Sequence, residues 1–133
     1  MNTDLKQYAL TEKIIAVFFE VYNELGHGFL ESVYQRSLLV ALGETGLTVH
    51  SPIDIPVWFR GHQVGCFEGD ILVEKCVLLE LKAARALDSS HKAQLLNYLR
   101  ATDIEIGLLL NFGLKPEFKR LIYDNPRKET HNP

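Results

Sequence analysis

Two charged residues interrupt a run of the sequence that otherwise reads as a buried strand. Glu80 and Lys82 stand in the apolar segment 77–82, and successive side chains on a strand point to opposite faces, so both share one face. A carboxylate and an ammonium buried in a strand cost free energy unless they are paired, hydrogen-bonded or bound to a metal. This placement indicates either a site that does chemistry or a structural ion pair.

Asp70 is the residue that we expect opposite Glu80. If residues 74–76 form a three-residue hairpin loop, positions whose numbers sum to 150 face each other. Two carboxylates then meet on one face, and a divalent cation with oxygen ligands relieves their repulsion. Mg²⁺ commonly binds through one or two carboxylates plus phosphate oxygens of a substrate. The alternative is a Glu80–Lys82 ion pair at the strand end, with Asp70 as a turn residue after Gly69.

Two predicted helices add polar side chains. In the second helix, Glu31 shares a stripe with Tyr34, so its carboxylate can approach the sheet. In the third, His91, Gln94 and Tyr98 form a polar stripe that offers donors to a substrate phosphate. Taken singly, Glu31 is more often a rim residue and the stripe more often an amphipathic edge. Their joint appearance favours a site.

The helices that position these residues follow from hydrophobic periodicity. Apolar residues spaced i, i+3, i+4, i+7 predict a first helix that begins at Thr11 as its N-cap and ends at Leu25. Glycines then separate it from a second helix over about 30–42. Ser89 or Ser90 is expected to cap a third helix, up to about residue 101.

The strands lie in the middle and at the end of the chain. Runs over 53–60, 63–73 and 76–83 predict a three-stranded meander, and 104–112 is an apolar run typical of a buried strand. Residues 117–123 fit a strand or a helix. The order α-α-β-β-β-α-β predicts the α/β class, with one mixed sheet and helices packed on it.

Length and composition bound the class of protein. The chain has 133 residues, 47% hydrophobic and 23% charged, which predicts a single cored domain over 1–133 with a short flexible tail from about residue 125. No apolar run is long enough for a membrane span and the start does not resemble a signal peptide, so we expect a cytoplasmic protein without a membrane partner. Cys66 and Cys76 have neither zinc nor redox spacing, and are expected to be reduced, mostly buried thiols.

The charge is unevenly distributed. The formal net charge of −3 argues against a protein that coats nucleic acid by charge alone. Residues 1–74 hold four Lys and Arg against ten Asp and Glu, whereas residues 75–133 hold ten against seven. The second half is therefore the candidate phosphate-facing half, although an asymmetry of this size also arises by chance.

The sequence resembles a known family along nearly its whole length. Gly28-Phe29-Leu30-Glu31-Ser32-Val33-Tyr34 is similar to the GxxExxY motif, which names a family of small bacterial and archaeal proteins in the PD-(D/E)xK nuclease superfamily. The resemblance continues through Gly69-Asp70, Glu80-Leu81-Lys82, Gln94-Leu95-Leu96-Asn97-Tyr98 and Asn111-Phe112-Gly113. It implies a restriction-endonuclease-like αβββαβ core, with a mixed sheet flanked by helices.

The resemblance also implies roles for residues. Asp70 and Glu80 correspond to metal ligands, Lys82 to the catalytic lysine, and Glu31 to the helix acid near the metal. Gln94 and Tyr98 fit the QxxxY motif of RecB-like members, which binds substrate. The motif aspartate follows Gly69 where the superfamily name has Pro, a variation that many members share.

These implications give the leading functional hypothesis, a nuclease that hydrolyses phosphodiester bonds of DNA, with RNA as an alternative. The expected cofactor is Mg²⁺ or Mn²⁺, held by Asp70, Glu80 and the Leu81 backbone carbonyl, with Glu31 as a further ligand. Lys82 would orient the attacking water and offset developing charge. The residues expected to position the nucleic-acid backbone are Gln94, Tyr98, Arg85 and Lys92.

Two other classes of function are left open. One is a non-catalytic module that binds nucleic acid or protein on a nuclease-like fold, and metal binding discriminates it from an enzyme. The other is hydrolysis of a small phosphorylated ligand, which a modestly basic surface can support. The sequence leaves the cleavage mode and the oligomeric state open, a homodimer included.

Overall fold

The computed structural model describes residues 3–124, in which three helices and seven strands are formed. The helices are α1 (Thr3–Leu25), α2 (Glu31–Glu44) and α3 (Ser89–Arg100). The strands are β1 (Val49–His50), β2 (Ile53–Phe59), β3 (His62–Gly69), β4 (Ile71–Val73), β5 (Val77–Lys82), β6 (Ile106–Phe112) and β7 (Pro116–Ile122). The predicted tail from residue 125 lies outside the described residues.

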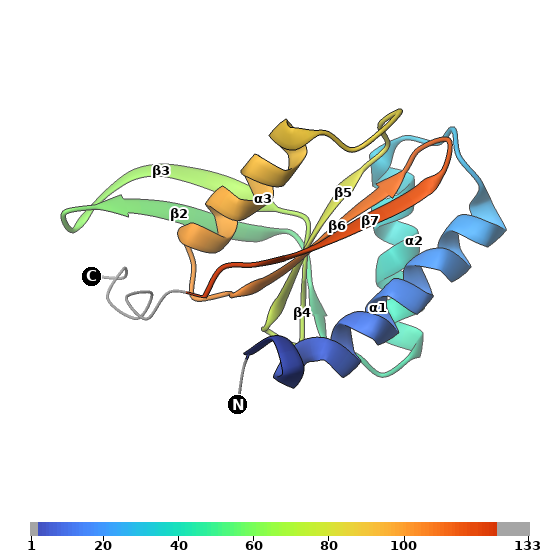
Figure 1. Cartoon of the computed structure of the whole chain (residues 1–133), viewed down its shortest axis with the longest axis horizontal. Coiled ribbons are helices and arrows are strands. Elements are labelled where there is room, and N and C mark those ends of the chain that lie inside the picture. Colours follow the sequence, from blue (N-terminus) through green and yellow to red (C-terminus); the bar gives the residue numbers. More distant parts are fainter. Residues whose placement is uncertain (1–2, 125–133) are drawn as a thin grey trace.

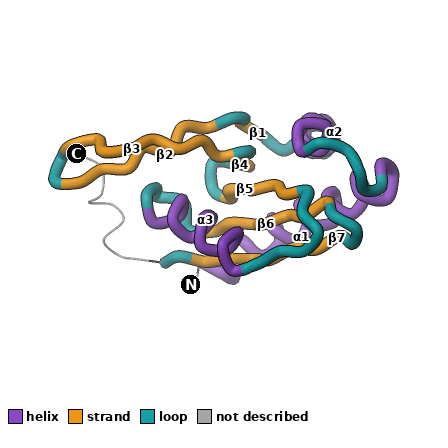
Figure 2. Tube along the Cα trace, turned by 90° about the horizontal axis from the view of Figure 1, so that it is seen from above, coloured by secondary structure: helices purple, strands orange, loops and turns teal. Residues whose placement is uncertain are grey.

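The strands form two sheets. The main sheet has the order β1-β4-β5-β6-β7, with β5 and β6 parallel and the other pairs antiparallel. Strands β2 and β3 form a separate hairpin, which extends away from α1 and α2 toward the opposite side of the molecule (Figures 1 and 2). A mixed sheet flanked by helices confirms the predicted α/β class and is consistent with a restriction-endonuclease-like fold.

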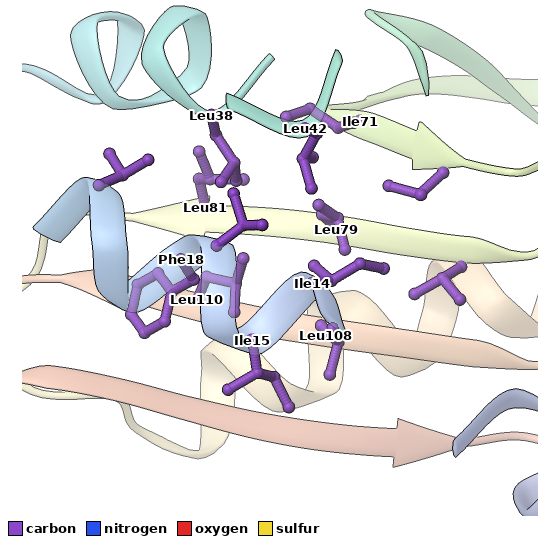
Figure 3. Packing of buried hydrophobic residues seen from close by; sticks show 14 of the residues in the cluster. Ile14, Ile15, Phe18, Leu38, Leu42, Ile71, Leu79, Leu81, Leu108 and Leu110 are labelled. Atoms are coloured by element: carbon purple, nitrogen blue, oxygen red, sulfur yellow. The ribbon is translucent and has the colours of Figure 1, made fainter. Parts of the chain in front are cut away.

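The main sheet is covered on both faces. On one face, Ile14 and Phe18 of α1 pack with Leu79 of β5 and Leu110 of β6, and α2 adds Leu38 (Figure 3). On the other face, a second cluster joins α3 and the hairpin to the sheet; its buried members are Ile55, Leu78, Leu95, Tyr98, Leu99 and Leu109. Because strand side chains alternate, Glu80 and Lys82 share the α3 face with Leu78.

The turn between β4 and β5 has the register that the sequence predicts. Cα partners are Ile71 with Leu79, Leu72 with Leu78 and Val73 with Val77, which leaves residues 74–76 as the three-residue loop. The turn is tight, with positive φ angles of 52° at Glu74 and 58° at Lys75. This register brings Asp70 level with Glu80 at the open end of the hairpin.

The first helix begins earlier than predicted. Thr11 is not an N-cap but a buried residue inside α1, and its hydroxyl donates to the Tyr8 carbonyl at 3.0 Å, one turn back. Arg120 Nε donates to the same hydroxyl at 3.1 Å, which ties α1 to β7. The residues before Thr11 contain no Gly or Pro, so nothing local stops the helix there.

The predicted three-stranded meander is wrong. The run 63–73 is divided at Asp70: its first part pairs with β2 in the hairpin, and its second part becomes β4 in the main sheet. The edge position beside β4 is taken by β1, which pairs Val49 with Val73. A β-rich pattern indicates strands but not the sheet in which each strand pairs, so periodicity alone does not detect the split.

Smaller expectations also change. The N-cap of α3 is Asp88, whose Oδ1 accepts from the backbone N–H groups of Ser90 at 2.9 Å and His91 at 3.2 Å. Residues 116–122 form a strand and not a helix. Cys66 is exposed and Cys76 half-buried, so the expectation of mostly buried thiols is wrong. None of the helices described is both long and apolar enough to cross a membrane.

Candidate active site

Asp70 and Glu80 are interlocked at the junction of the hairpin and the main sheet. The backbone N–H of Asp70 donates to Oε1 of Glu80 at 3.1 Å. The carboxylate of Asp70 in turn accepts from the backbone N–H of Leu81 through Oδ2 at 2.7 Å. Each acid is thus fixed by the backbone of the opposite segment, which brings the two predicted metal ligands together on one face.

The backbone of Asp70 is itself held by side chains from other elements. Its carbonyl accepts from Ser51 Oγ at 2.5 Å and from Gln35 Nε2 of α2 at 3.2 Å. Gln35 Nε2 also donates to Ser51 Oγ at 2.8 Å. Side chains from two other segments therefore converge on the Asp70 carbonyl, which makes the position of the Asp70 carboxylate rigid.

Gly69 explains why the hairpin can pass so close to the sheet. A Cβ at this buried position would lie 3.0 Å from the side chains of Ile53 and Ile55 and 3.1 Å from Leu78. These contacts are tight, so glycine lets the chain approach β5 where Asp70 must meet Glu80. Glycine at the place of the motif proline therefore has a packing reason.

Burial raises the pKa values of both acids, and the charge of a neighbouring carboxylate adds to each shift. Glu80 is only 4% exposed, and burial, with the charge of Asp70 second, raises its pKa to about 8. Burial is also the main reason that the pKa of Asp70 is raised, although the Leu81 N–H and the Lys82 ammonium oppose it. The charge of Glu31 contributes to the raised pKa of Asp70. The site therefore disfavours two negative charges unless a cation compensates them.

Lys82 belongs to a hydrogen-bonded chain of side chains with α3. Its Nζ donates to Gln94 Oε1 at 2.8 Å, and Gln94 Nε2 donates to the Tyr98 hydroxyl at 3.2 Å. Tyr98 is buried and its pKa is raised, first by burial and then by the charge of Glu80. The structure brings these three predicted residues together beside the acids.

The structural ion pair that the sequence left open is not formed. No nitrogen–oxygen distance within 4.0 Å joins Lys82 to Glu80, both of which the structure describes. The ammonium still lowers the pKa of Glu80 and of Asp70 through its charge. Lys82 thus lies near the acids while its hydrogen bond goes to a neutral amide.

The remaining predicted residues differ in their distance from the acids. Glu31, the first residue of α2, accepts from the Ala83 backbone N–H through Oε1 at 3.4 Å, which places it at the end of β5. Arg85 is exposed in the loop after β5, and His91 serves the N-terminal cap of α3. Lys92 is exposed, and residues two apart on a helix face different directions, so it does not share the face of Gln94.

The site fits a hard divalent cation that completes its coordination with water or phosphate. In residues 3–124, no group of three or more His, Cys, Asp or Glu side chains is placed to hold a metal ion. Asp70 and Glu80 supply two carboxylates, and Mg²⁺ typically binds proteins through one or two carboxylates while keeping several waters. The paired acids with raised pKa values match that demand.

Asn111 is the site residue for which the sequence analysis gave no role. It is fully buried in β6 and is the register partner of Lys82 in the parallel pair. Its Oδ1 accepts from the Ala84 N–H and its Nδ2 donates to the Ala84 carbonyl, both at 2.9 Å. The available signal was a single polar residue in an otherwise apolar strand, which is also how Glu80 stands out in β5.

Comparisons with known proteins agree on the fold. The family model described as the PD-(D/E)XK nuclease superfamily matches residues 8–121. A solved structure described as "Crystal structure of SSO0001" superimposes with a TM-score of 0.54 at 15% identity, over 94% of this chain and 63% of that chain. This likeness shows the fold alone, and the present chain spans less than two thirds of that structure. The comparison with curated proteins gave no match.

Proposed function

Since the chain belongs to the PD-(D/E)XK nuclease superfamily, we propose that it hydrolyses phosphodiester bonds of nucleic acid, with DNA as the substrate. The observation that carries the proposal is the interlocked pair of acids. The Asp70 N–H donates to the Glu80 carboxylate at 3.1 Å, and the Leu81 N–H donates to the Asp70 carboxylate at 2.7 Å. Within the superfamily, the segment 28–34 supports membership of the GxxExxY family.

The proposed cofactor is Mg²⁺ or Mn²⁺, since nucleases of this superfamily typically use divalent metals. Asp70, Glu80 and the Leu81 carbonyl would hold the ion, and Glu31, at the end of β5, would add a ligand or hold a bound water. A divalent ion bound here supplies Lewis-acid polarisation of the phosphate and a water of lowered pKa.

We assign to Lys82 the role of a positive charge held in a fixed position beside the reacting phosphate. Its ammonium is held 2.8 Å from Gln94 Oε1, which leaves two of its three protons for the attacking water and a phosphate oxygen. Gln94 is in turn fixed by the Tyr98 hydroxyl at 3.2 Å. We assign Gln94 and Tyr98 to positioning Lys82 and the backbone of the substrate.

The other proposed substrate contacts are electrostatic. Arg85 follows β5 closely and is exposed, so it can pair with a phosphate next to the scissile one. Lys92 contributes at most a more distant phosphate contact, given its position on α3. Contacts of this kind fix the register of the nucleic acid without reading its bases.

A cleavage assay tests the proposal. Single-stranded, double-stranded and branched DNA and RNA are incubated with the protein in Mg²⁺, Mn²⁺ or EDTA, and we expect metal-dependent cleavage of DNA. Asp54→Asn, at an exposed position of the hairpin, is the matched control for Asp70→Asn. Failure to cut any substrate in either metal, with no Mg²⁺ binding in calorimetry, would favour the non-catalytic binding module.

A further inference from the structure

A cavity of about 310 Å³ opens at the ends of β5 and β6, and its lining residues suggest a ligand. It is lined by residues 27–28, 83–85 and 112–114. The last two segments directly follow or end the parallel strands β5 and β6. In α/β sheets, ligands commonly bind in the crevice at the carboxyl ends of parallel strands.

The walls of the cavity are held in place by side chains behind them. The Tyr34 hydroxyl donates to the Gly26 carbonyl at 2.6 Å, which fixes the loop between α1 and α2. The Tyr22 hydroxyl donates to the Gly113 carbonyl at 2.7 Å, and Asn111 holds Ala84 by two hydrogen bonds. Because each wall is pinned separately, the cavity is preformed and a ligand loses little free energy in ordering it.

The chemistry of the walls suits a flat organic ring with a phosphate attached. Phe112 is apolar but almost fully buried, whereas Leu114 is apolar and 59% exposed, so Leu114 offers the apolar surface that a ring can cover. Arg85 adds a guanidinium that pairs with phosphate oxygens. His27 adds a planar imidazole, which can stack on a base.

The cavity lies near the proposed site along β5, although none of Asp70, Glu80 and Lys82 lines it. Ala83, which lines it, follows Lys82 directly, and its N–H donates to Glu31 at 3.4 Å. Ala83 is three residue steps from Glu80, roughly 10 Å along the direction of β5. If the scissile phosphate lies at Asp70 and Glu80, the base of the adjoining nucleotide is therefore within reach of the cavity.

We propose that this cavity binds the base of a nucleotide adjacent to the scissile phosphate, with Arg85 on that nucleotide's own phosphate. The inference deepens the proposed nuclease function and rests on it. A base inserted here is unstacked from its neighbours, so the substrate is single-stranded DNA or the frayed end of a duplex. Apolar contact reads no hydrogen-bond pattern, so no base preference is expected.

A binding experiment that needs no cleavage tests the cavity. Deoxyadenosine monophosphate and deoxyribose 5-phosphate are titrated into the ¹⁵N- and methyl-labelled protein in EDTA and followed by nuclear magnetic resonance. We expect the nucleotide, but not the sugar phosphate, to shift the methyl signals of Ala83, Ala84 and Leu114. Leu114→Gln should weaken binding of the nucleotide by roughly fivefold to tenfold, because it removes apolar contact without adding charge.

Val40→Gln is the matched control, an aliphatic residue 63% exposed on α2 and outside the cavity lining. Its nucleotide affinity should stay within about twofold of the wild type. Equal binding of the two titrants, no binding of either, or equal weakening by both variants would overturn the inference.

Cleavage separates the two proposals. In single-stranded DNA with one abasic site moved along the strand, cleavage should fall at least fivefold when the missing base is the one next to the scissile bond. If the wild type cuts every abasic substrate equally well, the proposed nuclease function stands and the proposed base-binding cavity is rejected. If the wild type binds the nucleotide as described and cuts no substrate, the proposed nuclease function is rejected and the cavity stands as a nucleotide site.

Discussion

The Nζ atom of Lys82 lies 2.8 Å from Oε1 of Gln94, so a strand residue of the sheet is oriented by a neutral amide on α3. An ion pair with Glu80 would have placed the ammonium against the acid and withdrawn its charge from a substrate. The amide acceptor instead fixes the direction of the side chain and leaves the positive charge uncompensated at short range. In the proposed nuclease, this arrangement would separate binding of a cation from stabilisation of the reacting phosphate.

Lys82→Ala tests that separation. The two acids remain, so Mg²⁺ affinity by calorimetry should persist, whereas the rate of DNA cleavage should fall by about 100-fold or more because one stabilising donor is lost. Gln94 keeps its hydrogen bond to Tyr98, so the fold should change little. Lys92→Ala, at an exposed position on α3, is the control and should retain most activity.

A different result would support a structural role. If Lys82 compensated a buried charge on Glu80, its removal would cost about 3 to 5 kcal/mol in the free energy of unfolding. A Lys82→Ala protein that melts early, from a wild type that binds no Mg²⁺, would point to a module without catalysis.

Asp70→Asn tests the metal site directly. The amide oxygen can still accept from the Leu81 N–H, so the geometry survives, but one ligand charge is lost. Changes outside the ligand set already cost 10- to 100-fold in metal affinity, so we expect a loss of about 100-fold or more in Mg²⁺-dependent cleavage.

In EDTA the same protein should be as stable as the wild type or slightly more stable, because the repulsion with Glu80 is gone. The increase in melting temperature caused by Mg²⁺ should disappear. Asp54→Asn should behave as the wild type in each measurement. Turnover that is unchanged in Asp70→Asn would remove Asp70 from the proposed site.

Local sequence patterns predicted that Asp70 and Glu80 meet, because charged residues in a buried strand violate local rules. Glu80 and Lys82 stand out in β5 because buried charges are costly, and the short turn fixes the register that brings Asp70 opposite Glu80. Strand alternation then assigns the shared face. None of these steps needs information from distant parts of the chain.

The parts that were missed depend on long-range pairing. Nothing local shows that the chain leaves the hairpin at Asp70 and enters another sheet, or that β5 pairs in parallel with β6. The role of Asn111 appears only once that parallel pair places it beside Lys82 and against Ala84. The residues before Thr11 in α1 likewise make long-range contacts, such as the hydrogen bond between Cys76 and Gln7.

Gly113→Ala tests whether the loop after β5 must lie against β6. A Cβ at Gly113 would stand 1.9 Å from the Ala84 carbonyl oxygen, a backbone atom that cannot rotate away. We expect a loss of about 1 to 3 kcal/mol in the free energy of unfolding, measured by urea denaturation, together with reduced cleavage. Gly43→Ala, in α2, where an added Cβ would meet no other described segment within 4 Å, should be stabilising by about 0.5 to 1 kcal/mol. Equal effects of the two substitutions would show that the close approach at Ala84 is not required.

The raised pKa of Glu80 makes the stability of the metal-free protein depend on pH. An unperturbed glutamate has a pKa of 4.5, whereas burial and Asp70 raise that of Glu80 to about 8 in the folded protein. The folded state therefore holds this proton more tightly than the unfolded state. The stability that Glu80 contributes is full below pH 4.5 and is lost as the pH rises toward 8. Each pKa unit corresponds to about 1.4 kcal/mol, so the effect amounts to a few kcal/mol at most.

Urea denaturation in EDTA at pH 5, 6, 7 and 8 measures this dependence, and Glu80→Gln isolates it, because the amide cannot titrate. We expect the difference in unfolding free energy between wild type and Glu80→Gln to move in favour of Glu80→Gln as the pH rises. Mg²⁺ should reverse the trend for the wild type alone, because the ion binds the ionised carboxylates and releases the proton. Its stabilising effect should therefore be greater at pH 8 than at pH 5. A wild type and a Glu80→Gln variant with parallel pH profiles, both insensitive to Mg²⁺, would show that Glu80 neither titrates as described nor holds a metal.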